Sequence, residues 1–382
     1  MGLIFDKLGR ILVYTFAANG FVYRCRKNRY GLRGCVDELP SLSEARCRML
    51  GLRPPLEVSL PAPHDMWPDV PTVDITVVVP CYNVERFVRE SLRSVLDQEC
   101  DASFEVIAVD DGSTDSTRDI LDSLAADNRR LRVIGQRNKG LSGARNAGLK
   151  AANGASIVFV DSDDVLAPEA LQTLYRELRR SGADYVTGMY RYIDEKGRVI
   201  PVGKKRPSGV AWGRIFDREV WSRLEFPEGV WYEDTVHAYM VAPQFKESTI
   251  GDVVYSYRKQ VGSITAISRS SKRSVDTYFV TEAMLGWRSA MGMPFNQKMY
   301  DQTLYQLGPL LLNRTVALDR DESKCLFVLA SNLLKSSNPG GVRVILQKNG
   351  SILSERSWKA TMVSGSWPHP RFSYREARLR AT

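Results

Sequence analysis

Between residues 74 and 181 the chain alternates short apolar runs with segments of helical periodicity. The apolar runs are rich in β-branched residues, and in the segments between them apolar residues recur every three or four positions. Strands are predicted at 75–79, 104–109, 131–134 and 157–160, and helices at 85–97, 116–126, 142–152 and 168–181. This order is typical of a doubly wound α/β domain, with a mainly parallel sheet and helices on both faces.

The last of these strands ends in an acidic cluster. Four apolar residues run directly into Asp161, Ser162, Asp163 and Asp164, so three carboxylates stand where a buried strand stops. Such carboxylates repel one another, and a divalent cation, Mn²⁺ or Mg²⁺, would relieve the repulsion. The alternative is a solvated acidic turn that caps the next helix, because Asp is a common N-cap residue.

Two other predicted strands also end in polar residues. Pro80, Tyr82 and Asn83 follow the first strand, and Asp110 and Asp111 follow the second. Ligands of open α/β sheets bind at the carboxyl ends of strands, so three polar loops on one edge favour a binding site. A carboxylate there can accept from a base or a ribose, and a tyrosine ring can stack on a base. The alternatives are a helix cap for the second loop and a lid on the core for Tyr82.

Three further stretches carry groups suited to phosphate binding or proton transfer. Arg145 lies in a glycine-spaced run at 139–148 that matches neither standard nucleotide fingerprint; it could clamp a diphosphate or lie on a helix surface. Glu233 and Asp234 lie among aromatic residues, where partial burial would raise a carboxylate pKa toward that of a general base. The alternative for this pair is an acidic helix N-terminus. Arg258 begins a donor-rich loop that could hold phosphate or form a turn.

The net charge of +9 is concentrated at the two ends of the chain. Residues 1–60 hold ten Lys and Arg against five acids, and residues 340–382 hold eight against two. These ends could contact anionic lipid or an anionic polymer, or simply keep the chain soluble. No nucleic-acid-binding module accompanies the charge, so we expect no nucleic-acid partner.

Cysteine usage and hydropathy indicate the compartment. The six cysteines show no CxxC spacing and there are only three histidines, so we expect a reducing cytoplasm, without a disulfide framework or structural zinc. No stretch reaches the roughly 20 apolar residues that cross a bilayer. Residues 3–17 have a helical apolar stripe that could lie on a membrane or dock on the core. A peripheral position on the inner face of the cell membrane is therefore a further expectation.

Six motifs resemble, in order and spacing, those of family-two glycosyltransferases with the GT-A fold. They are VVVPCYN at 77–83, VDDGSTD at 109–115, GARNAGL at 143–149, FVDSDD at 159–164, the pair at 233–234 and YRKQVGSIT at 257–265. One such motif is weak evidence, whereas six in order are specific. We expect a glycosyltransferase domain at 74–265, after a basic extension and proline-rich linker at 1–73. A basic, mostly helical region at 266–382 follows, with helices near 278–287, 304–312 and 325–334 and a strand near 342–347.

The resemblance implies how the donor is held. Asp111 would bind the nucleotide base, with Asp110 beside it and Tyr82 stacking on the ring. Asp161 and Asp163 would bind Mn²⁺ or Mg²⁺ on the donor diphosphate as a DXD motif, with Asp163 the principal ligand and Asp164 in support. The donor is a nucleotide sugar, and a UDP-sugar is the first expectation.

The resemblance also implies the reaction. Asp234, next to Glu233, would deprotonate an acceptor hydroxyl, and a single in-line displacement would invert the anomeric centre. The acceptor would be a glycan or a lipid-linked saccharide in the synthesis of a surface polysaccharide or glycoconjugate. Relatives often have a histidine after the last core strand, where this chain has Arg258, so Arg258 is a candidate phosphate ligand.

Two other functions compete with this one. A nucleotidyltransferase that makes nucleotide sugars also uses an α/β sheet and acidic metal ligands. It would need a glycine-rich basic loop after the first strand, where this chain has Cys81, Tyr82 and Asn83. An inactive glycan-binding or scaffold protein would have lost the acidic residues, yet those of every motif are present.

Overall fold

The computed structural model describes residues 39–53, 67–260 and 267–337, with two short strands at 347–348 and 351–352. Several predictions lie outside the described residues: the amphipathic helix at 3–17, residues 54–66 of the linker, the loop at 261–265 and most of the strand near 342–347. Contacts divide the chain into two units, Met1–Ser337 and Asn338–Thr382. The second is described by one antiparallel pair, β10 (Gln347–Lys348) and β11 (Ser351–Ile352).

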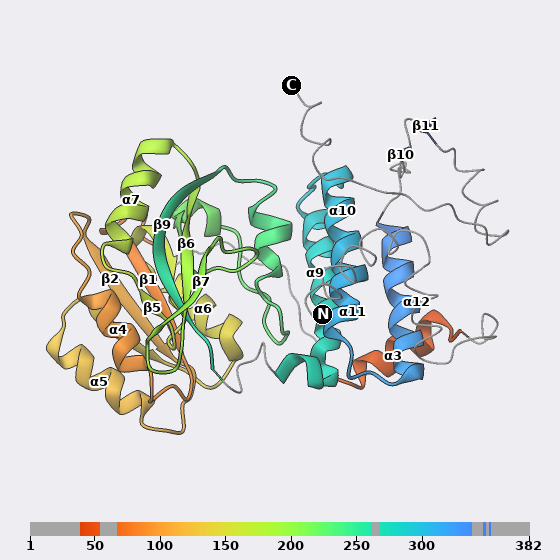
Figure 1. Cartoon of the computed structure of the whole chain (residues 1–382), viewed down its shortest axis with the longest axis horizontal. Helices are drawn as coiled ribbons and strands as arrows, with labels where there is room; N and C mark the ends of the chain where they lie inside the picture. Colours follow the sequence, from red (N-terminus) through yellow and green to blue (C-terminus); the bar gives the residue numbers. More distant parts are fainter. Residues whose placement is uncertain (1–38, 54–66, 261–266, 338–346, 349–350, 353–382) are drawn as a thin grey trace. The chain divides into compact units, whose positions relative to one another are not determined.

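The first half of the main sheet is parallel, as the sequence predicted. Its strands run in the order β3-β2-β1-β4, and all three pairings are parallel. Figure 1 labels β1 and β2 of this half of the sheet. The strands are β1 (Val73–Cys81), β2 (Phe104–Asp110), β3 (Leu131–Gly135) and β4 (Gly154–Phe159). The helices between them are α4 (Val88–Leu96), α5 (Thr117–Asp127) and α6 (Gly140–Lys150).

The second half of the sheet is mixed. The order continues β4-β8-β6-β9-β5, and β7 pairs with β6; among these, β6 and β9 are parallel and the other pairs antiparallel. The strands are β5 (Val165–Leu166), β6 (Tyr185–Ile193), β7 (Val199–Lys205), β8 (Arg214–Asp217) and β9 (Glu247–Arg258). Helix α7 (Ala170–Ser181) lies between β5 and β6 in the chain. The predicted α/β class is confirmed, with a mixed extension of the parallel sheet.

Both faces of the parallel strands are buried. Val77 and Val79 of β1 belong to one apolar cluster, whereas Val78 between them belongs to another, because successive side chains of a strand point to opposite faces. Helices α4, α5 and α7 cover the first face, and α6 with the segment 220–241 covers the second. Each fully buried valine or leucine contributes about 1.5–3 kcal/mol, so this packing fixes the strands whose ends form the site.

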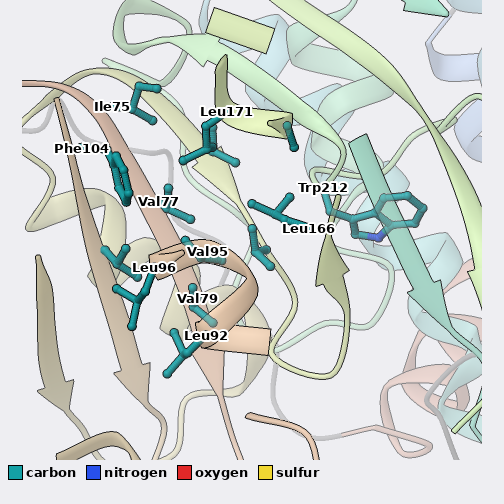
Figure 2. Close-up of a cluster of buried hydrophobic side chains, with 14 of the residues drawn as sticks. Ile75, Val77, Val79, Leu92, Val95, Leu96, Phe104, Leu166, Leu171 and Trp212 are labelled. Atoms are coloured by element: carbon teal, nitrogen blue, oxygen red, sulfur yellow. The ribbon is translucent and has the colours of Figure 1, made fainter. Parts of the chain in front are cut away.

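The first cluster joins residues far apart in the chain. Figure 2 shows side chains of β1 and α4 packed against residues from β2, β5, α7 and the loop before β8: Ile75, Val77, Val79, Leu92, Val95, Leu96, Phe104, Leu166, Leu171 and Trp212. The apolar face of the helix predicted at 85–97 is thus the face that α4 buries.

A helical region follows β9. It contains α9 (Asp276–Ala290), α10 (Gln297–Tyr305), α11 (Leu311–Arg314) and α12 (Arg320–Ser336). The helix expected near 304–312 is divided by a wide turn at Gln306–Leu310 that contains Pro309, which has no N–H to donate. Shorter helical turns are Arg218–Trp221, His237–Val241, Ser268–Ser270 and Lys272–Val275. Within the described ranges, no helix has the length and apolar character needed to cross a bilayer.

An N-terminal helix, α3 (Leu42–Leu50), packs into this helical region. Met49 of α3 lies in one apolar cluster with Phe279 of α9 and with Leu326 and Leu329 of α12. The sequence did not predict this contact, because residues 1–73 showed no pattern that names a partner. Part of the N-terminal extension is therefore built into the core of the C-terminal helices.

Two helical glycines give a matched test of the packing between α6 and β1. A Cβ at Gly148 would overlap Val78 Cγ1, whereas one at Gly286 in α9 would meet nothing within 4 Å. We expect Gly148→Ala to destabilise the protein by about 1–3 kcal/mol through overpacking. Gly286→Ala should stabilise it by about 0.5–1 kcal/mol through helix propensity. Denaturant unfolding of both variants measures this, and equal effects would show that α6 does not approach β1 closely.

Candidate active site

The loops after β1, β2 and β4 meet at one edge of the sheet. Cys81 at the end of β1 pairs with Asp110 at the end of β2, and Val78 pairs with Phe159 of β4. Parallel pairing therefore brings together the polar residues at 80–83, 110–111 and 161–164. This is the edge at which open α/β sheets bind their ligands.

Asp111 is buried, and two donors orient its carboxylate. Its Oδ1 accepts from Gln136 Nε2 at 2.7 Å and from the backbone N–H of Lys139 at 2.8 Å. Asp110 accepts from the N–H of Ser113 at 3.0 Å, which shapes the turn after β2. Gln136 was not predicted because the residues after β3 contain no acidic cluster that marks a binding loop.

The residues after β1 differ in what they offer a ligand. Tyr82 leaves 49% of its surface exposed, so its ring is open to stacking. Asn83 has a φ of 50°, in the left-handed region that Asn tolerates, and its Oδ1 accepts from the N–H of Thr114 at 2.8 Å. Pro80 is buried inside β1, where it pairs with Val109, so its side chain is not turned to the open edge.

The acidic cluster is not a solvated helix cap. Helix α7 begins after Glu169 without a side-chain cap, so residues 161–164 do not cap it. Burial, and then the Asp161 carboxylate, raise the pKa of Asp163 to about 6. Burial raises the pKa of Asp164 well above its usual range, and its buried Oδ2 has no partner in the described residues. Ser162 between them is buried. The cluster holds negative charge that its protein neighbours only partly neutralise.

Asp161 and Asp163 each keep one oxygen for a cation. Asp161 Oδ1 accepts from Arg145 at 2.8 Å, and Asp163 Oδ2 accepts from Gln260 Nε2. Among the described residues, no three His, Cys, Asp or Glu side chains form a ready metal cluster. Mg²⁺ and Mn²⁺ do not require one, because they commonly bind one or two carboxylates together with substrate phosphates. The donor set therefore fits such an ion only if a ligand supplies the remaining oxygens.

Arg258 is bound to protein groups. It is 2% exposed; its side chain donates to Glu90 Oε2 at 2.6 Å and to the carbonyl of Asp163 at 2.7 Å, and to the carbonyls of Asp194 and Glu195 at 3.2 and 3.1 Å. Its backbone N–H also holds Asp164. These contacts tie the acidic cluster to α4 and to the turn after β6. These contacts give Arg258 a structural role in the site, and its predicted contact with phosphate stays a prediction.

One buried guanidinium joins the acidic cluster to the second acidic pair. Arg145 of α6 has a side chain only 1% exposed and donates to Asp161 at 2.8 Å, to Glu233 at 2.9 Å and to Asp234 at 3.3 Å. Burial alone would lower its pKa, but the three carboxylates outweigh burial and raise it. Arg145 is therefore not a surface residue, and its partners are carboxylates.

Asp234 has the properties of a general base. Burial, and then the neighbouring Glu233, raise its pKa to about 7, although Arg145 acts in the opposite direction. Its Oδ1 also accepts from the N–H of Ala211 at 3.2 Å, and 24% of its side chain remains exposed. A carboxylate that titrates near neutral pH and reaches solvent is suited to take a proton from a bound hydroxyl.

The loop that carries this pair, residues 226–235, is held at several points. Asn146 of α6 donates to the carbonyl of Phe226 at 2.9 Å. Asp276 of α9 accepts from the N–H of Trp231 at 2.9 Å and from Arg53, which follows α3, at 2.5 Å. Tyr232, just before the pair, has a φ of 67°, a strained value that tyrosine rarely adopts. The helical region and the N-terminal segment thus help to place the candidate base.

Comparison with known proteins decides the family. The model for "Glycosyl transferase family 2" matches residues 76–231, which include the ends of β1, β2 and β4 but not that of β9. These residues form a family-two glycosyltransferase domain. The match stops just before Glu233 and Asp234, so the acidic pair is placed by the geometry of the loop and by the motif order.

Two relatives and one solved structure extend the comparison beyond the family-two domain. The chain is 29% identical over 282 residues to glycosyltransferase GlyG of Streptococcus pneumoniae, covering 66% of this chain and 88% of GlyG. It is 35% identical over 136 residues to chondroitin synthase of Escherichia coli, covering 35% of this chain but only 19% of the relative. The crystal structure of S. aureus TarS matches with a TM-score of 0.52 and 21% identity, over 70% of this chain and 49% of TarS. The TarS likeness supports the GT-A-type fold.

Two arginines of the N-terminal segment test how the loop is held. Arg53 and Asp276 are fully buried, whereas Arg46 pairs with Glu282 at 2.7 Å on the surface. We expect Arg53→Met to cost about 3–5 kcal/mol, because it leaves a buried carboxylate short of positive charge. Arg46→Met, the matched loss of charge, should cost under about 1 kcal/mol. Urea unfolding compares the two, and a small loss for Arg53→Met would show that this ion pair does not hold the loop.

Proposed function

We propose that this chain is an inverting glycosyltransferase that moves a sugar from a nucleotide-sugar donor to a glycan or lipid-linked acceptor in polysaccharide synthesis. The observation that carries the proposal is the shared arginine. Arg145 binds the first acid of the DXD motif and the candidate base Asp234, so a donor site and a base lie one side chain apart. The name of GlyG supports glycosyl transfer, and that of chondroitin synthase supports transfer to a glycan.

In the proposed complex the donor lies along the strand edge. Asp111, fixed by Gln136, accepts from the nucleotide base, and the exposed ring of Tyr82 stacks on it. Asp161 and Asp163 would hold Mn²⁺ or Mg²⁺. When bound, such an ion neutralises charge on the departing nucleoside diphosphate. A UDP-sugar is the first donor to test.

Asp234 then accepts the proton of the acceptor hydroxyl. The acceptor oxygen forms a bond to the anomeric carbon as the bond to the nucleoside diphosphate breaks on the opposite face, which inverts the configuration. Glu233 keeps the pKa of Asp234 high, and Arg145 keeps the carboxylate in place. The proton ends on Asp234, and the negative charge leaves with the diphosphate.

The proposal extends to organisation and location. We place the glycosyltransferase domain at 74–265, between an N-terminal extension and a helical region that helps to hold the loop of the base. The four cysteines in the described residues, Cys47, Cys81, Cys100 and Cys325, are free, which supports a reducing cytoplasm. Contact with the inner face of a membrane through the basic ends is part of the same proposal.

The base assignment predicts a pH profile. A carboxylate with a raised pKa is active only when deprotonated, so kcat/KM should fall about tenfold per pH unit as the pH drops below 7. Asp234→Asn should reduce turnover by about 10²–10⁴-fold and retain donor binding. Asp252→Asn, an exposed site on β9, is the matched control. Normal turnover in Asp234→Asn, or a flat profile from about pH 6 to 8, would contradict the assignment.

The metal assignment is tested through donor binding. With Mn²⁺ and a panel of UDP-, GDP- and dTDP-sugars, we expect release of nucleoside diphosphate that EDTA abolishes. Asp163→Asn should weaken metal-dependent nucleotide binding by about tenfold or more, measured by calorimetry, because it removes a ligand carboxylate. EDTA-resistant turnover, or unchanged binding in Asp163→Asn, would show that the acidic cluster does not hold a metal.

A further inference from the structure

Arg314, at the end of α11, is a half-buried arginine next to the candidate base. Its guanidinium lies over the ring of Tyr232, 3.7 Å from the centroid, and Tyr232 directly precedes Glu233 and Asp234. Its one hydrogen bond to a described residue is to Thr277 Oγ1, at 3.3 Å. The hydroxyl of Tyr232 is also buried without a partner in the described part of the chain.

Four buried arginines of the chain have more polar partners than Arg314 has. Arg145, Arg258 and Arg53 each form an ion pair with a carboxylate. Arg214, which has none, donates to three neutral acceptors, Thr187 Oγ1 and the carbonyls of Val210 and Pro207. Arg314 has no carboxylate within 4 Å among the described residues and one weak neutral acceptor. The nitrogens of Arg314 that lack a protein partner are not fully buried, so they are open to a ligand that completes their hydrogen bonds.

The pKa of Arg314 agrees with its lack of an ion-pair partner. Burial lowers its pKa, and the more distant carboxylates of Glu233 and Asp234 only partly offset the effect. The guanidinium therefore lies within electrostatic reach of both acids without pairing with either. Its free N–H groups are available in a planar fork suited to an oxyanion.

Arg314 does not belong to the strand edge where the proposed donor lies. The donor diphosphate of the proposed function belongs at the ends of β1, β2 and β4, with Asp161 and Asp163. Arg314 comes from the helical region and lies over Tyr232, the residue that directly precedes the acidic pair in the chain. A second anion at this place belongs to the molecule whose hydroxyl Asp234 deprotonates.

We propose that Arg314 binds an oxyanion of the acceptor, a phosphate or a carboxylate close to the attacking hydroxyl, so that the preferred acceptors are acidic saccharides. This inference rests on the proposed function and names its acceptor class. The guanidinium forms a bidentate pair of hydrogen bonds with the oxyanion while it stacks on Tyr232. This contact places the neighbouring hydroxyl of the acceptor at Asp234.

The first test measures acceptor preference in the full chain. Hexose 6-phosphates are compared with the parent hexoses, and uronic acids with their methyl esters, which separates phosphate from carboxylate as the source of the anion. We expect the charged member of a pair to be preferred and Arg314→Gln to reduce that preference roughly 10- to 100-fold through KM. Arg314→Lys should fall between, because it keeps the charge but loses the fork. Equal losses on both members would make Arg314 a structural support and overturn the proposal.

The second test does not depend on turnover. Calorimetric titration with inorganic phosphate in EDTA should show binding to the wild-type protein that Arg314→Gln weakens at least tenfold. Arg269→Gln is the matched control, since Arg269 lies in the same region and donates to Asn313; it should bind phosphate as the wild type does. Phosphate binding that is absent, or unaffected by Arg314→Gln, would overturn the proposal. Absence of nucleoside diphosphate release from any donor would instead count against the proposed function.

Discussion

The candidate active site depends on a single buried guanidinium. Arg145 is removed from water, and its ion pairs with Asp161, Glu233 and Asp234 offset the free-energy cost of desolvating the guanidinium. The same attraction holds these carboxylates together although they come from two different loops. Arg145 reaches them because α6 lies against β1 at Gly148. The spacing between the donor edge and the base therefore follows from how closely one helix packs on one strand.

The sequence predicts the parallel half of the fold well, because apolar runs and helical periodicity report local geometry directly. Asp111 and Asp161 could be placed at one edge because parallel strands end together. The partners of Arg145 could not be predicted, since spacing along α6 does not say which face meets a carboxylate. The protein partners of Arg258 could not be predicted for a related reason: Glu90 lies 168 residues away in the chain.

The mixed half of the sheet and the helical region show the same limit. Strand β9 could be recognised as a strand, but its parallel pairing with β6 depends on contacts that no local pattern encodes. The helix predicted near 304–312 ran through Pro309, although a proline inside a helix lacks one backbone donor and so favours the interruption between α10 and α11. Ala211 gave no signal at all, since it contributes only a backbone N–H to Asp234.

The burial of Arg53 against Asp276 has a consequence for the boundaries of the molecule. The family-two match starts at residue 76, which suggests that the catalytic part could be expressed from there. Such a fragment would lack α3 and would leave Asp276, beneath the loop of the base, exposed to water or short of positive charge. The smallest piece that keeps this loop in place should therefore be longer than the sequence match. It should begin at or before α3 and end no earlier than α12.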